Sequence, residues 1–215
     1  MPSPTLLFTA IDFLGVFVAA VGGALEAVRN KRFEFDVIGV TGLAFVSALG
    51  GGILRDVLVQ AGPPLAFRNP VYILVALAGA AVGLLFRGSF GPKTEKLLFV
   101  VDAAALGLFA VTGSTRGLAN GLSFLPSMLL GGTTAVGGGA MRDVLSGTTP
   151  RIFIRGQFHA IAALSAAVIF LLAYSSGMGQ TVATMVGVST AFIVRLASVR
   201  FDWQTAPVRK GPAEE

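Results

Sequence analysis

Two nearly identical stretches place an arginine and an aspartate inside otherwise apolar segments. The sequence GGGILRDVL at residues 50–58 returns as GGGAMRDVL at residues 137–145, 87 residues later, with seven of nine positions identical. Ionisable side chains within a membrane segment are costly, and they face a partner or a watery cavity. These residues could therefore hold or guide ions in a membrane. Neither copy has the glycine spacing of a phosphate-binding loop.

Two further aspartates stand 90 residues apart, each near the start of an apolar segment. We expect Asp12 to lie near Arg55 and Asp102 near Arg142, because each pair falls at a similar depth. Neighbouring helical residues point about 100° apart, so the arginine and aspartate of one motif need not pair with each other. These charges either clamp and gate the helices or line an ion path directly. The charged candidates are Asp12, Arg55, Asp56, Asp102, Arg142 and Asp143.

The glycine runs fall in the middle of their segments. Each glycine costs a helix about 1 kcal/mol relative to alanine, and three together favour a kink or a break. Broken helices at matching positions in two halves are typical of transport sites, whereas small residues also allow close helix packing. Both interpretations stay open. The candidates are Gly50, Gly51, Gly52, Gly137, Gly138 and Gly139.

Hydroxyl side chains near these glycines could replace part of the hydration shell of an ion. They could equally bond to their own helix backbone. These polar candidates are Thr112, Ser114, Thr133 and Thr134. The only histidine, His159, matches Tyr72 at the 87-residue offset, and we expect it to be structural rather than a proton relay.

The composition indicates an integral membrane protein. Of 215 residues, 54% are hydrophobic and 13% are charged, against about 25% charged in soluble domains. The net charge of +5 comes from loops and the tail, which suits anionic membrane lipid and not nucleic acid. The absence of cysteine excludes disulfides and thiolate metal sites. No hydrolase motif such as HExxH or GxSxG occurs, so we expect no enzyme, no metal site and no cofactor.

Seven apolar segments are long enough to cross a bilayer, which takes about 17–25 residues. They are 6–28, 37–61, 70–87, 96–116, 122–146, 157–175 and 179–200. With the N-terminus outside, eleven basic residues fall on the cytoplasmic side and only Arg68 and Arg116 fall outside. The positive-inside rule therefore predicts a cell-membrane protein with an outer N-terminus and a cytoplasmic C-terminus.

The first three segments match the next three, and three is an odd number, so the second copy enters the membrane from the opposite side. The predicted fold is all-α, with an inverted three-plus-three repeat, a seventh helix and glycine-kinked second and fifth helices. We expect one membrane domain over 1–215: repeat A at about 6–87, repeat B at about 96–175, the extra helix at about 179–200 and the tail at 201–215. Such repeats place a pathway at their interface, although a duplication kept only for packing is the alternative.

The doubled GGGxxRD motif within seven such segments resembles the prokaryotic branch of the trimeric intracellular cation (TRIC) channel family, which includes bacterial relatives described as glycine transporters. The resemblance implies a homotrimer with one pore per subunit. It also implies that the permeant ions are monovalent cations, chiefly potassium or else sodium, and that the kinks lie at the glycine runs. The alternative is a secondary transporter of a small neutral amino acid such as glycine, because alternating access also uses broken helices.

Overall fold

Helices form almost all of the part that the computed structural model describes, residues 6–60, 62–86, 92–156 and 158–205, with side chains in the third range from residue 95. They are α1 (Leu6–Arg29), α2 (Val37–Leu58), α3 (Leu65–Arg68), α4 (Val71–Leu85), α5 (Pro92–Ala119), α6 (Phe124–Leu145), α7 (His159–Ser175) and α8 (Gln180–Arg200). Each of the seven predicted segments is a helix with ends within a few residues of the prediction. The single turn α3 was not predicted. Predicted positions 61, 87, 157 and 206–215 lie outside the described residues.

Four of the described helices are long and apolar enough to cross a membrane: α1, α2, α5 over Glu95–Ala119, and α8. The apolar helices α4 and α7 have only 15 and 17 residues. Helix α6 has 22 residues, but its glycines and threonines lower its hydropathy. The protein is thus an all-α membrane protein with four clear spans, and the full count of seven stays a prediction.

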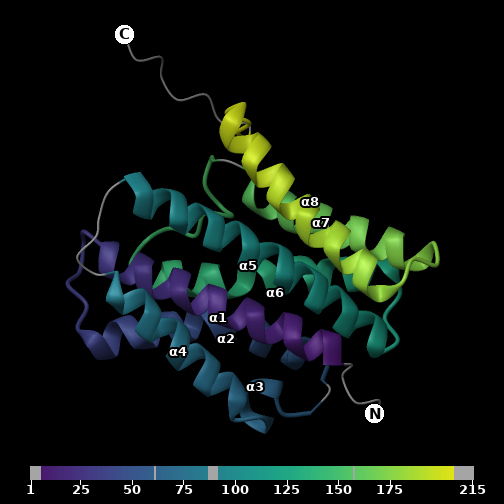
Figure 1. Cartoon of the computed structure of the whole chain (residues 1–215), viewed down its shortest axis with the longest axis horizontal. Coiled ribbons are helices and arrows are strands. Elements are labelled where there is room, and N and C mark those ends of the chain that lie inside the picture. Colours follow the sequence, from purple (N-terminus) through teal and green to yellow (C-terminus); the bar gives the residue numbers. More distant parts are fainter. Residues whose placement is uncertain (1–5, 61, 87–91, 157, 206–215) are drawn as a thin grey trace.

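The helices pack in two similar groups that meet at the centre of the bundle. Helix α1 packs against α2 and α4, and α5 packs against α6 and α7. The groups meet where α1 contacts α5 and where α2 contacts α6. Figure 1 shows that α1 and α5 run in opposite directions across the bundle. Helix α8 lies outside both groups, against α7 and α5.

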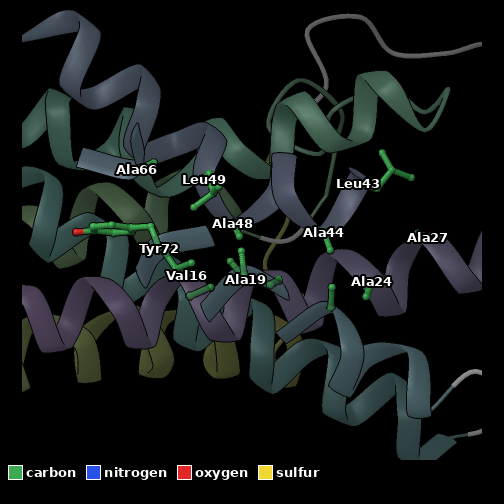
Figure 2. Packing of buried hydrophobic residues seen from close by; sticks show 14 of the residues in the cluster. Val16, Ala19, Ala24, Ala27, Leu43, Ala44, Ala48, Leu49, Ala66 and Tyr72 are labelled. Carbon is green, nitrogen blue, oxygen red and sulfur yellow. The ribbon is translucent and has the colours of Figure 1, made fainter. Parts of the chain in front are cut away.

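Small side chains hold α1 against α2. Val16, Ala19 and Ala24 of α1 share one buried cluster with Ala44 and Ala48 of α2 (Figure 2). Small residues let membrane helices approach closely, so that dispersion contacts and polar groups hold them together. This close approach brings the N-terminal half of α1 beside the C-terminal half of α2, so that Asp12 of α1 lies near Arg55 of α2.

The glycine runs lie where α2 crosses α6, and helical structure continues through both runs without a break. A Cβ atom on Gly51 would collide with the carbonyl oxygen of Thr134, and one on Gly138 would collide with that of Ser47. Both pairs of positions, 47 with 134 and 51 with 138, are 87 residues apart. Close packing therefore accounts for the central glycine of each run, and the kink stays a prediction.

Candidate ion pathway

A buried group of charges joins α1 to α2 near one end of the bundle. Arg55 Nη1 donates to Asp12 Oδ1 at 3.0 Å, and Arg55 Nε donates to Asp56 Oδ1 at 3.0 Å. All three side chains are at most 2% exposed. The expected pair of Asp12 with Arg55 is present. The Arg55 guanidinium also bonds to its sequence neighbour Asp56. The sequence did not require this contact, because adjacent helical residues point about 100° apart.

Two further hydrogen-bond donors and a second arginine complete this group. The Tyr72 hydroxyl of α4 donates to Asp12 Oδ2 at 2.7 Å, and the Leu65 amide of α3 donates to Asp56 Oδ2 at 2.8 Å. Arg116 Nε of α5 lies 3.5 Å from Asp56 Oδ1. Two arginines therefore balance two carboxylates, and all four carboxylate oxygens have a partner. We call this the first charge cluster, made of Asp12, Arg55, Asp56, Tyr72 and Arg116.

A second charge cluster occupies the matching positions of the other half but is paired differently. Arg142 donates to Asp143 Oδ1 through Nε at 3.0 Å and Nη2 at 2.7 Å. Asp102 Oδ2 lies 3.3 Å from Arg195 Nη2 of α8 and 3.5 Å from His159 Nδ1. The expected direct pair of Asp102 with Arg142 is thus not formed. The reason is that Arg142 turns back to its neighbour and α8, which lies outside the repeat, supplies a cation instead.

Three cavities lie in series, from a wide one at the second charge cluster to a narrow one at the first. The wide cavity, about 300 Å³, is lined by the carboxylates of Glu26, Glu95 and Asp102. Its arginines are Arg29, Arg142, Arg151 and Arg195. It shares Asp102 and Arg142 with a middle cavity of about 30 Å³. The middle cavity shares Phe109 with a narrow cavity of about 10 Å³ beneath the first charge cluster. Since one water needs about 10–15 Å³, the narrow cavity has room for about one.

Residues at the repeat offsets line the middle and the narrow cavity alike. One set lines the narrow cavity, and its partners, 87 or 90 residues later, line the middle one. The pairs are Asp12 with Asp102, Gly52 with Gly139, Arg55 with Arg142 and Tyr72 with His159. The two cavities therefore offer similar chemistry, a carboxylate beside a guanidinium and a glycine, on either side of Phe109.

The predicted hydroxyl candidates lie away from these cavities. Thr112 and Thr134 donate to carbonyl oxygens of their own helices, at 3.4 and 2.6 Å. Ser114 is fully buried, and Thr133 lines a separate apolar groove of about 420 Å³ together with Leu54 of α2. A part for these four side chains in permeation stays a prediction from the sequence.

Sequence reasoning missed several residues of the pathway. Glu26 and Phe109 were not singled out, and Arg116 was counted only as a basic residue on the outer side. A signal existed for Arg195, because a lone charge within an apolar segment needs a partner. No such signal marked Phe109, one of 17 phenylalanines in the chain.

Comparisons with known proteins agree with this architecture. A family model described as "Glycine transporter" matches residues 9–88 and 99–175. A UPF0126 membrane protein of Deinococcus radiodurans is 36% identical over 204 residues, covering 94% of this chain and 92% of the relative. The inner membrane protein YadS of Escherichia coli is 29% identical over 192 residues, covering 89% of this chain and 91% of YadS.

Solved structures give the same family. The TRIC trimeric intracellular cation channel orthologue from Rhodobacter sphaeroides matches with a TM-score of 0.83 and 31% identity, over 92% of this chain and 99% of that one. A structure described in work on conductance through TRIC cation channels matches with a TM-score of 0.79 and 27% identity, over 97% of this chain and 100% of that one. The shared fold, length and sequence show that this multi-pass membrane protein belongs to the prokaryotic TRIC family of membrane cation channels, which are not enzymes.

Proposed function

We propose that the chain is a passive channel for monovalent cations, with potassium preferred and one pore in each subunit. The observation that carries the proposal is the series of three cavities, which runs through a single copy of the chain from the wide cavity to the first charge cluster. Most of its wall comes from α1, α2, α5 and α6, so both halves of the chain contribute. Polar groups at this depth in a membrane protein mark an ion or solute path.

The two halves of the pathway are inverted copies in this proposal. Three observations support it: the family model matches two stretches of similar length, α1 and α5 run in opposite directions (Figure 1), and the contacts of α1 with α2 and α4 parallel those of α5 with α6 and α7. The third glycine of each run, Gly52 or Gly139, lines a cavity. A bend at either glycine run would therefore change the width of the pathway.

The structure corresponds to a closed passage in this proposal. Both oxygens of Asp12 already accept hydrogen bonds, from Arg55 and from Tyr72, so neither is free for a cation. A cation that binds at this cluster has to displace Arg55 or Tyr72 from the carboxylate of Asp12. Glu26, Glu95 and Asp102 in the wide cavity are each paired with an arginine as well. Such paired charges leave a weak net field, which favours modest selectivity among monovalent cations.

We place the assembly in the cell membrane as a homotrimer, with the N-terminus outside. The Rhodobacter sphaeroides relative is a trimeric channel, and YadS is an inner membrane protein. Two contacts gather the basic loops at one end of the bundle: Arg32 Nη1 donates to the Gly147 carbonyl at 2.6 Å, and the Thr205 amide donates to the Gly156 carbonyl at 3.2 Å. The positive-inside rule assigns that end to the cytoplasm.

Light scattering of the purified protein tests the trimer. The chain has no cysteine, so a single cysteine placed in the loop after α1 reports its side of the membrane through an impermeant thiol reagent. Labelling of this loop from outside intact cells would contradict the orientation.

Planar-bilayer recording under a potassium chloride gradient tests the channel itself. We expect discrete current steps that reverse near the potassium potential. A Gly139→Leu variant should reduce the current, because its side chain enters the middle cavity. Gly42→Leu is the matched control, since a Cβ atom there meets no atom within 4 Å. Equal currents from both variants would contradict the assigned pathway.

Uptake of labelled glycine into vesicles tests the second candidate function, a secondary transporter of a small neutral amino acid. The name of the matching family model and the arginines of the wide cavity, which suit a carboxylate, favour this candidate. Saturable uptake without current steps would support the transporter and contradict the channel.

A further inference from the structure

We infer that Phe109 is the hydrophobic gate of this pathway, an assignment that rests on the proposed channel function. Within the described part of the chain, Phe109 is the one side chain that lines both the middle and the narrow cavity. Its ring therefore stands between the two charge clusters. A cation that moves from one cavity to the next must pass this ring.

The surroundings of the ring make it the main obstacle on this route. Phe109 is 3% exposed and belongs to the buried cluster that also holds Ala19, Ala48 and Ala105. The ring rests against α1 at Gly15, where an added Cβ atom would lie 3.0 Å from Phe109 Cε1. The alanines are too short to close the gap themselves. An apolar constriction of this kind blocks ions because water does not fill it and a cation cannot shed its hydration shell there.

The obstacle is present in only one half of the repeat. Phe109 stands 90 residues after Ala19, which is the offset that relates Asp12 to Asp102. Ala19 lines the middle cavity, and Phe109 lines the narrow cavity as well as the middle one. Helix α1 thus forms with a small side chain at the matching position. Phe109 therefore supplies the one large side chain of this matched pair, and the small side chain of Ala19 lines the same middle cavity.

This asymmetry permits a test in which the ring is moved and not merely removed. The full-length protein is reconstituted in vesicles loaded with potassium, and passive potassium efflux is measured. We expect Phe109→Ala to raise resting efflux about tenfold, which corresponds to about 1.4 kcal/mol off the barrier. The double variant Ala19→Phe/Phe109→Ala restores a ring at the equivalent position, so we expect efflux to return toward the wild-type rate.

Phe170→Ala is the matched control for loss of packing. Phe170 is 1% exposed and lies in a different buried cluster with Val111 and Leu171, away from the three cavities. It should lose comparable stability, because both changes delete a buried ring, but leave efflux at the wild-type rate. If Phe109→Ala folds poorly, Phe109→Leu gives the same comparison with a smaller void and should raise efflux less.

The outcomes separate the gate from the channel. If the wild type shows potassium efflux and neither Phe109→Ala nor Phe109→Leu changes its rate, the gate assignment is wrong, but the channel function is still supported. Equal increases in Phe109→Ala and Phe170→Ala would also overturn the gate, because they would show a general loss of packing. Silence of the wild type and Phe109→Ala alike, in vesicles that release potassium when valinomycin is added, would overturn the channel function itself.

Discussion

Replacement of Asp12 by asparagine should destabilise the protein much more than the same replacement of Asp102. The Asp12 carboxylate is 2% exposed and bonds to Arg55 at 3.0 Å and to Tyr72 at 2.7 Å. The Asp102 side chain is 20% exposed, lines the wide cavity, and has its nearest cation, Arg195, at 3.3 Å. The chemical change is identical, so the difference reports the surroundings.

The magnitude follows from what each arginine retains. Removing one partner of a buried ion pair costs about 3–5 kcal/mol. In Asp12→Asn the new amide would keep one acceptor oxygen and Arg55 would keep Asp56, so we expect about 3 kcal/mol. At Asp102 the cavity can admit water to Arg195, and a solvated pair contributes about 0–1 kcal/mol. A difference of about 2 kcal/mol corresponds to roughly a 30-fold difference in the folding equilibrium.

Denaturant unfolding of the purified protein in detergent, followed by circular dichroism, measures both free energies under one condition. The two variants serve as controls for each other, because each removes one carboxylate near the start of an equivalent helix. Equal losses, or a larger loss at Asp102, would refute the reasoning. They would mean that the first charge cluster is hydrated, or that Asp56 alone balances Arg55.

Three further predictions concern single atoms. Gly51→Ala and Gly138→Ala should each destabilise the fold by about 3 kcal/mol in denaturant unfolding, through overpacking against a carbonyl of the other helix. Gly42→Ala, with open space around it, should be neutral or stabilising in the same assay. Tyr72→Phe should lower the free energy of unfolding by about 1.5–3 kcal/mol, since it removes a hydrogen bond to a charged group. Unchanged stability in denaturant unfolding would contradict this prediction. Gly52→Ala places a Cβ atom 3.7 Å from Arg55 Nη2, an ordinary contact, so stability should be unchanged or slightly higher. A changed bilayer current without a loss of stability would then assign a functional bend to this glycine.

The helices and one ion pair were predictable because they depend on local or repeated signals. Long apolar runs with basic residues between them locate the helices. The repeat and the segment boundaries place Asp12 and Arg55 at a similar depth in the membrane. In the structure Arg55 donates a hydrogen bond to Asp12 at 3.0 Å. Helix α3 was not predictable in this way, because its four residues are too few for a periodic pattern.

The partners that differ between the halves could not be predicted by symmetry. Repetition alone pairs Asp102 with Arg142, but α8 has no counterpart in the first half, and its Arg195 takes that place. The glycine runs were equally ambiguous. A run of glycines can indicate either a kink in one helix or a close contact between two helices. Only the contacts of Gly51 and Gly138 show that α2 and α6 cross at these runs. The position of Phe109 depends on three helices at once, which no local pattern records.

The contact between Asp102 and Arg195 also has a consequence for biosynthesis. Asp12 meets Arg55 after 43 residues, within the first half of the chain, whereas Asp102 must await a residue 93 positions later. At about 5–20 residues per second, that interval lasts roughly 5–20 s of translation. During it, the arginine that lies 3.3 Å from Asp102 has not yet been made, although His159 and the cavity arginines Arg142 and Arg151 become available earlier. Helix α8 therefore completes the charge balance of the second half, and a nascent chain that stops before α8 should be the form that membrane quality control removes.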